Sequence, residues 1–107
     1  MFNDLDIFDN NKAARDKMVE VIKYAQPDFI ITHNPDDYMP DHTAVSRLVF
    51  DASFTATLPN YKCGGEKAAK LVPIYYMDTL AGVNFNPTEF VDISDEIDLK
   101  IKMLECH

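Results

Sequence analysis

The apolar run DFIITH (28–33) constrains the fold more than any other stretch, because it lies between two segments of helical periodicity. Its core letters, FII, follow one another without a polar interruption, which is typical of a strand buried on both faces in a parallel sheet. The preceding segment, 11–26, places apolar side chains at helical spacing. Asn10 or Asn11 can cap that helix, and Pro27 ends it. The pattern predicts a helix followed by a buried strand.

The rest of the chain continues to alternate. A second helix is predicted from about Asp41, and LVPIYYMD (71–78) reads as a strand that starts at Pro73. A short strand is predicted at FVDI (90–93), followed by a helix capped by Ser94. The apolar stripe of this last helix is formed by Ile97, Ile101 and Leu104.

The order helix, strand, helix, strand, strand, helix predicts an α/β layer fold with a mostly parallel sheet. With 107 residues, of which 47% are hydrophobic, the chain fits one small folded domain, 1–107. Three short strands make a thin sheet, so we expect an uncovered sheet edge through which the chain can self-associate.

Composition excludes several classes of partner. Ten Lys and Arg stand against eighteen Asp and Glu, which gives a net charge of -8. Nucleic acids and anionic lipid surfaces reward clustered basic residues, so we expect neither as a partner. The sequence shows no signal peptide and no apolar run of ~20 residues, and Cys63 and Cys106 belong to no CxxC or zinc-ribbon spacing. A disulfide between them is the alternative. A cytoplasmic protein with free thiols is expected.

The loop HNPDDYMPDH (33–42) follows the first predicted strand, where open α/β sheets place their ligand sites. Its histidines and aspartates offer nitrogen and oxygen ligands suited to zinc, although their spacing is far less specific than HExxH. The competing interpretation is structural, since prolines and aspartates are ordinary turn residues and Asp41 can serve as a helix cap, with His42 in the first turn.

One alternative for the loop remains, and two other groups of residues have structural interpretations. The loop itself can gather a metal from His33, Asp37 and His42, although this spacing matches no known compact site. His107 is expected to act as a helix-end cation and not as a ligand. The aromatic and sulfur side chains of the second strand are expected to pack in the core; they are Tyr75, Tyr76 and Met77.

Three segments together resemble the LmbE/PIG-L family of zinc-dependent N-deacetylases. They are DFIITHNPDDYMPDHTAVSRLVFDASF, VPIYYMD and FVDISDEIDLKIKMLECH, in that order. The resemblance implies a Rossmann-like α/β fold, here a partial one. It also implies a zinc-dependent hydrolase that removes acetyl groups from an N-acetylated amino sugar or a related conjugate.

The resemblance also implies site residues. The family holds zinc with a histidine and an aspartate from an AHPDD motif and with a histidine from a later HPDH motif. The letters PDH at 40–42 match that later motif, so His42 is implied as a metal ligand and Asp41 as the neighbouring catalytic acid. His33 matches a histidine often seen at the start of this loop, and we assign it no role.

Two departures from the family pattern change what we expect. No AHPDD occurs in the sequence, so two zinc ligands and the expected general base are absent. We therefore expect the C-terminal part of a longer deacetylase, with an incomplete zinc site and no hydrolysis by this chain alone. Met39 replaces the first histidine of HPDH, and its thioether cannot donate a hydrogen bond to an oxyanion. The alternative is a non-catalytic remnant that acts as a binding or self-association module.

Overall fold

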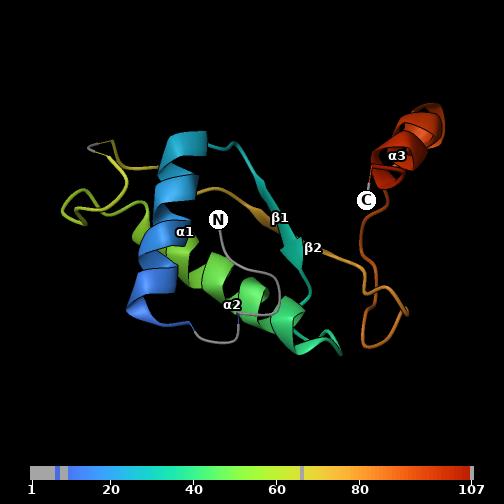
Figure 1. Ribbon diagram of the computed structural model, residues 1–107, viewed down its shortest axis with the longest axis horizontal. Helices are drawn as coiled ribbons and strands as arrows, with labels where there is room; N and C mark the ends of the chain where they lie inside the picture. The colour runs from blue at the N-terminus through green and yellow to red at the C-terminus, as the bar shows by residue number, and fades with distance from the viewer. Residues whose placement is uncertain (1–6, 8–9, 66, 107) are drawn as a thin grey trace.

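The protein is described by a computed structural model, which places residues 7, 10–65 and 67–106 (Figure 1). The elements follow the predicted alternation, except for one strand. They are α1 (Lys12–Ala25), β1 (Ile30–His33), α2 (Pro40–Thr55), β2 (Ile74–Met77), the 3-10 turn η1 (Ser94–Glu96) and α3 (Ile97–Leu104). His107, expected as a helix-end cation, lies outside the described residues.

The sheet consists of β1 and β2, which pair in parallel as predicted. Ile30 stands opposite Ile74, and His33 stands opposite Met77, so both strands end at the same edge of the sheet. Parallel pairing requires a crossover between the strands, and α2 provides it. The structure therefore shows a partial Rossmann-like α/β layer.

Local signals explain where α1 begins and ends. The Asn11 side chain accepts a hydrogen bond from the backbone N–H of Ala14, as the sequence predicted for the cap. At the other end Gln26 takes a left-handed conformation (φ 45°), and its N–H bonds to the carbonyl of Ile22. The helix thus stops shortly before Pro27.

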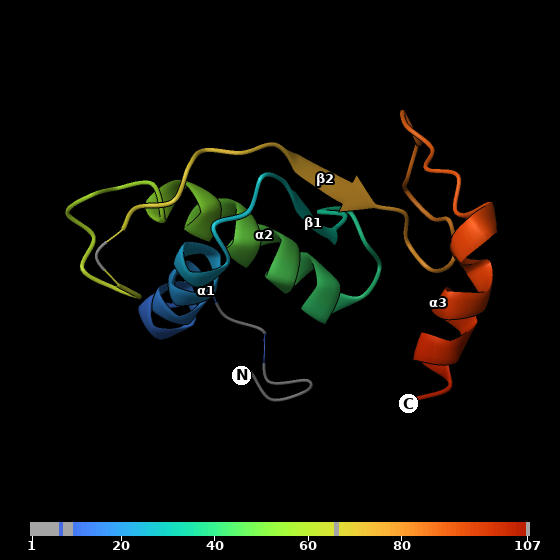
Figure 2. The same cartoon turned by 90° about the horizontal axis from the view of Figure 1, so that it is seen from above.

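The core lies between α1 and α2, which cover the same side of the sheet (Figure 2). Small side chains let the two helices approach closely, because Ala52 of α2 and Ala56, its C-cap residue, are completely buried in one cluster with Val19 of α1. Leu48, also in α2, is almost completely buried. These contacts fix the direction of α2, whose first turn points to the end of β1.

The opposite side of the sheet is open, so the prediction of a strand buried on both faces is wrong. Phe29 and Ile31 are 55% and 58% exposed, and Tyr75 and Met77 of β2 are 45% and 42% exposed. We call these four residues the open face. The reason is architectural, since α1 and α2 lie on one side and, within the described residues, no helix packs on the other. Tyr75 contacts Phe29 edge-on, with ring centroids 6.1 Å apart.

The strand predicted at 90–93 is also wrong. Phe90 and Val91 are 85% and 84% exposed, and this segment pairs with neither strand of the sheet. A β-prone sequence needs a partner strand to form a ladder, and none lies beside it in the part of the chain that the structure describes. Instead, the Asp92 side chain accepts the backbone N–H and the hydroxyl of Ser94. Ser94 is therefore the first residue of η1 and not a side-chain cap.

The loop 57–65 packs tightly on α1. Lys23, a buried lysine, donates its Nζ to the carbonyl of Tyr61 at 2.7 Å. Gly64 has a left-handed φ of 67°, and a Cβ placed there would lie 2.4 Å from the Cα of Glu20. Only glycine fits both the dihedral angle and this close approach. Cys63 in this loop and Cys106 near the C-terminus are free thiols, as expected.

We expect Gly64→Ala to lower the free energy of unfolding by ~2–4 kcal/mol, because a left-handed alanine and a backbone clash add together. Gly82→Ala is the matched control, since Gly82 has a φ of 64° and a Cβ placed there would meet no atom within 4 Å. It should cost only ~1–2 kcal/mol. Urea unfolding of both variants measures the difference, and equal losses would contradict the close approach to Glu20.

The carboxylate of Asp16 joins the same loop to α1. It accepts hydrogen bonds from Lys12 and from the Tyr61 hydroxyl, and these two bonds hold the pKa of Asp16 below its ordinary value. A carboxyl whose pKa is lower in the folded state stabilises the fold above its unfolded pKa of ~3.9. That stabilisation disappears as the pH falls through the folded-state pKa.

Asp16→Asn should therefore lower the free energy of unfolding at neutral pH, and the deficit should shrink as the pH falls below ~3.9. Unfolding curves at several pH values test this expectation. Asp28→Asn removes the same charge from an exposed position and serves as the control. A deficit for Asp16→Asn that is constant with pH would show that the carboxylate charge is not involved.

Candidate metal centre

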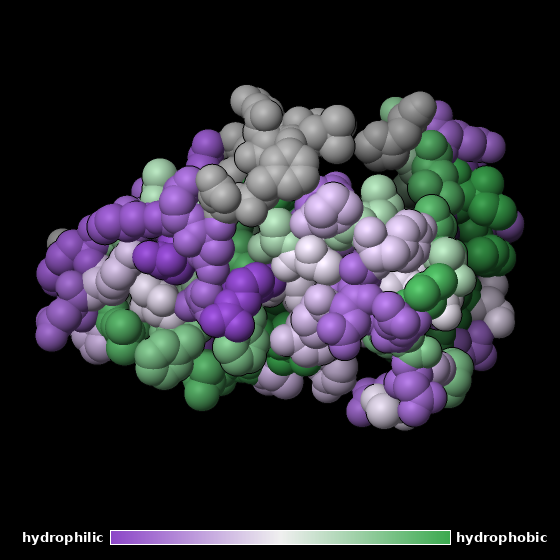
Figure 3. Space-filling model, turned by 90° about the horizontal axis from the view of Figure 1, so that it is seen from below, coloured by the Kyte–Doolittle hydropathy of each residue, from purple (hydrophilic) through white to green (hydrophobic). Residues whose placement is uncertain are grey.

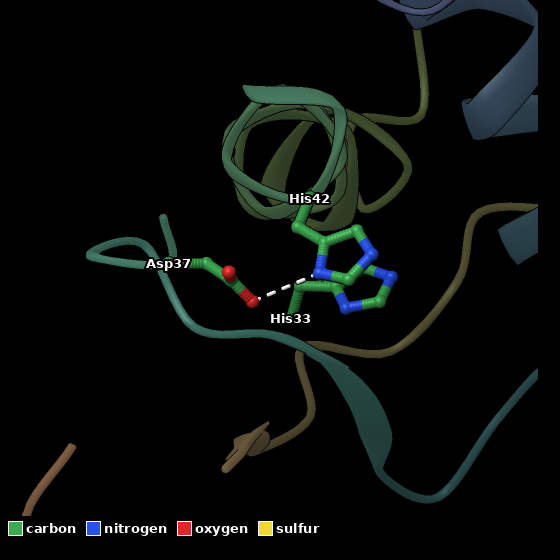
Figure 4. A group of neighbouring side chains, drawn as sticks. All are labelled: His33, Asp37 and His42. Carbon is green, nitrogen blue, oxygen red and sulfur yellow. Dashed lines mark hydrogen bonds and ion pairs between the residues drawn. The ribbon is translucent and has the colours of Figure 1, made fainter. Parts of the chain in front are cut away.

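The loop 34–39 connects the end of β1 to the start of α2 and brings three side chains together (Figure 4). His33 is the last residue of β1, Asp37 lies within the loop, and His42 is the third residue of α2. The loop can fold back sharply because the N–H of Asp37 bonds to the carbonyl of Asn34 at 3.2 Å. The group lies beyond the carboxyl end of a parallel strand, where α/β folds bind their ligands.

Asp37 uses both of its carboxylate oxygens inside the loop. Oδ1 accepts the backbone N–H of Met39 at 3.0 Å, and Oδ2 lies 2.9 Å from Nδ1 of His42. Its side chain is only 2% exposed. Burial alone would raise the pKa of the Asp37 carboxyl, but the hydrogen bonds from Met39 and His42 outweigh burial and bring the pKa below its ordinary value. The carboxylate is therefore ionised at neutral pH.

His42 is held in the first turn of α2. Met39 is the N-cap residue and Pro40 occupies the first helical position, where the fixed φ of proline suits a helix start. Because Nδ1 of His42 faces Asp37, Nε2 is the ring nitrogen that remains for another ligand. The side chain is 25% exposed, so a metal or a substrate can reach it.

His33 stacks on His42. The ring centroids lie 3.9 Å apart and the ring planes differ by 14°. Burial, together with the nearby His42, lowers the pKa of His33, so its imidazole is neutral near pH 7. A neutral His33 ring can lie this close to His42 without charge repulsion.

His33, Asp37 and His42 could hold a metal ion, because one ligand atom of each lies within 4.8 Å of the others. Two imidazoles and a carboxylate form a donor set that suits zinc and other first-row metals. The stacking restricts how both histidines can bind one metal ion, however. Imidazole lone pairs lie in the ring planes, and two nearly parallel planes do not meet near the rings. One ring must therefore turn before both can bind the same ion, whereas His42 can bind through Nε2 without moving.

A second loop, which follows β2, holds the loop 34–39 in place. The buried Asn34 donates its Nδ2 to the carbonyl of Asn84 at 3.2 Å, and Asn84 donates in turn to the carbonyl of Asp36 at 3.5 Å. Asn84 itself is held by a tight turn in which Thr79 Oγ1 accepts the N–H of Val83. Sequence reasoning missed both asparagines, although parallel strands bring the loops at their carboxyl ends to one edge.

The structure brings some of the predicted site residues together and leaves others outside the group. His42 and His33 belong to the group, and so does Asp37, the third residue of the alternative in which the loop gathers its own metal. Asp41, expected to cap α2, lies in its first turn and outside this group, because Met39 takes the N-cap position. The acid that contacts His42 is therefore Asp37. The catalytic role of Asp41 stays a prediction.

Comparison with known proteins supports the family. Residues 2–53 match the family model described as PIG-L: GlcNAc-PI de-N-acetylase, and this range includes the whole loop 34–39. One similar solved structure is GalB, the 4-carboxy-2-hydroxymuconate hydratase from Pseudomonas putida KT2440, with 27% identity and a TM-score of 0.79. Another is the conserved protein TT1542 from Thermus thermophilus, with 28% identity and a TM-score of 0.77. No curated protein matches the chain.

The two structural alignments cover 90% and 91% of this chain but 41% and 42% of the solved chains. This chain therefore spans about two fifths of the length of these relatives. Among the described residues, no helix has the length and apolar character that crossing a bilayer requires. The family points to deacetylase or hydrolase-type chemistry that generally depends on a metal, and the His-His-Asp group offers possible ligands. Sequence match and fold agree: residues 2–53 match the PIG-L family, and the chain is consistent with part of an LmbE/PIG-L protein.

Proposed function

We propose that this chain supplies part of the site of a zinc-dependent N-deacetylase-type hydrolase. The substrate class is an N-acetylated amino sugar or a related conjugate. One observation carries the proposal: His42, in a segment that matches the PIG-L family, is held through Nδ1 so that Nε2 is available for a metal.

Three residues that flank the loop have roles in this proposal. His42 would hold the metal through Nε2, and His33 is the neighbouring imidazole that could turn toward it. When bound, zinc would polarise the amide carbonyl and acidify water. Asp41 is the proposed catalytic carboxylate, since it lies partly buried in the first turn of α2 beside His42.

Met39 restricts how an oxyanion can be stabilised. Its side chain has no hydrogen to donate, so a donor for a tetrahedral oxyanion must come from another group. Removing one such donor from an enzyme costs ~10²–10³ in rate, so the substitution favours either a replacement donor or a modified reaction. The hydratase activity of the relative from Pseudomonas is consistent with chemistry on this scaffold that differs from deacetylation.

The metal part of the proposal predicts that zinc added to the protein binds through His42. His42→Ala should remove the bound zinc or weaken its binding by at least ~100-fold, because one of few ligands is lost. His107→Ala, which removes the third histidine of the sequence, is the control and should leave the stoichiometry unchanged. Elemental analysis and calorimetric zinc titration give the answer.

The hydrolase part is tested by acetate release from N-acetylglucosamine conjugates in the presence of zinc. Acetate release that is lost in His42→Ala would establish the deacetylase directly, and it would overturn our expectation that this chain alone is inactive. Zinc binding that does not depend on His42 would contradict the proposal at its first step.

A second candidate function is self-association, and the exposed surface supports it. The chain has an accessible surface of 8153 Å², whereas a compact monomer of 12.2 kDa exposes roughly 6,000 Å². Its radius of gyration is 15.2 Å, against roughly 13 Å for a compact domain of this length. The excess, roughly 2,000 Å², is comparable to the area that a stable protein interface buries.

Much of this excess is apolar. Every apolar side chain of α3 is exposed, and Figure 3 shows hydrophobic residues gathered on that side of the molecule; they are Ile97, Leu99, Ile101, Met103 and Leu104. A groove runs between the open face and the chain leading to α3, lined by Ile31, Tyr75, Val91, Ile93 and Lys100 among others. Apolar surface on this scale marks interaction sites.

If the open face binds a second copy, light scattering should show a mass above 12.2 kDa that rises with concentration. Ile31→Lys should shift the protein toward monomer, because it puts a charge into the open face. Val21→Lys on α1 is the matched control, since Val21 is 55% exposed and Ile31 is 58% exposed. A monomer at all concentrations would exclude self-association.

A further inference from the structure

We propose that Asp37 is a positioning residue that fixes the orientation and the tautomer of His42 for metal binding. This inference rests on the proposed function, in which His42 binds the metal. It assigns to Asp37 a role through His42 and not a place among the ligands. The juxtaposition that carries it is the 2.9 Å contact between Asp37 Oδ2 and His42 Nδ1.

The contact is built into the loop. The Asp37 side chain is 2% exposed, which is unusual for an aspartate, and its second oxygen is anchored by the N–H of Met39 at 3.0 Å. The backbone N–H of Asp37 is anchored as well, to the carbonyl of Asn34. With three of its polar groups engaged, Asp37 cannot change rotamer without breaking at least two hydrogen bonds.

The chemistry of the pair determines the tautomer. An ionised carboxylate can only accept hydrogen bonds, so the hydrogen between the two groups belongs to Nδ1 of His42. In the neutral imidazole the lone pair then lies on Nε2, the nitrogen that does not face the loop. A carboxylate on the far nitrogen of a metal-binding histidine orients the ring and increases the basicity of the ligand.

The same geometry argues against Asp37 as a direct ligand. A metal on Oδ2 would compete with His42 for the charge of this carboxylate and weaken the hydrogen bond that holds the ring. His33 also restricts that rotation, because it stacks on the His42 ring at 3.9 Å. The hydrogen bond in the ring plane and the stacking above it together leave one orientation for His42.

The first measurement is the tautomer of His42 in metal-free protein, from two-bond proton–nitrogen correlations in its imidazole. It is made well above the ordinary histidine pKa of ~6.5. We expect Nδ1–H in the wild type and a shift toward Nε2–H in Asp37→Ala. Asp36→Ala is the control, because it removes an adjacent but exposed carboxylate. Nε2–H in the wild type, or an unchanged tautomer in Asp37→Ala, would overturn the inference.

The second measurement is zinc affinity by calorimetry. Asp37→Ala should weaken binding by ~10–100-fold, and Asp36→Ala should change it by less than about threefold. Asp37→Asn, which keeps the shape of the side chain and can still accept one hydrogen bond, should fall between these values and shows whether folding is intact. Equal affinities for Asp36→Ala and Asp37→Ala would overturn the positioning role.

The two measurements separate this inference from the proposed function. The wild type can have the Nδ1–H tautomer, and Asp37→Ala can lack it, although the wild type binds no zinc. In that case the proposed function fails, but Asp37 still orients His42. If zinc binds and depends on His42 but the tautomer does not depend on Asp37, the proposed function stands and the positioning role fails.

Discussion

The packing of α2 against α1 determines the position of everything else in this chain. Ala52 and Ala56 are buried completely because only small side chains allow the close approach to Val19, and Leu48 fills the space beside them. The helix is therefore fixed along its length, and its first turn is fixed with it. Since that turn carries His42, the precision of the candidate centre comes from a hydrophobic contact that contains none of its residues.

Polar contacts then complete what the helix packing begins. Asp37 reaches His42 because the loop turns back on Asn34, and the loop is held on its other side by Asn84. The histidines are thus restrained by a strand end, a helix start and two loops at once. The orientation of His42 in particular is supported on several sides, which is what precise positioning of a ligand requires.

The local parts of the fold could be predicted from the sequence. Helical spacing, the Asn11 cap and Pro27 give α1 nearly to the residue, and the apolar letters FII give β1. The errors concern elements whose state depends on a neighbour. Residues 90–93 have strand composition but, within the described part of the chain, no partner to pair with, and β1 has one bare face because helices cover one side only.

The candidate site, like the fold, could be predicted from the sequence only in part. The letters of the loop predict histidines and aspartates at the end of a strand, and the family resemblance selects His42. The sequence offers Asp37 as one alternative metal ligand but does not show that it faces the ring, because Asp36, Asp37 and Asp41 differ in backbone position and not in their chemistry. Asn84 is 50 residues from Asn34, so this contact depends on the parallel pairing of β1 with β2.

The link between Asn34 and Asn84 has a consequence for ligand recognition. It ties together the loops that follow the two strands, so that neither can be displaced without disturbing the other. A ligand that displaced the loop after β2 would have to break these two hydrogen bonds or move the loop that carries Asp37 as well. Because this cross-link already restricts both loops, part of the entropy that binding would remove is lost when the chain folds.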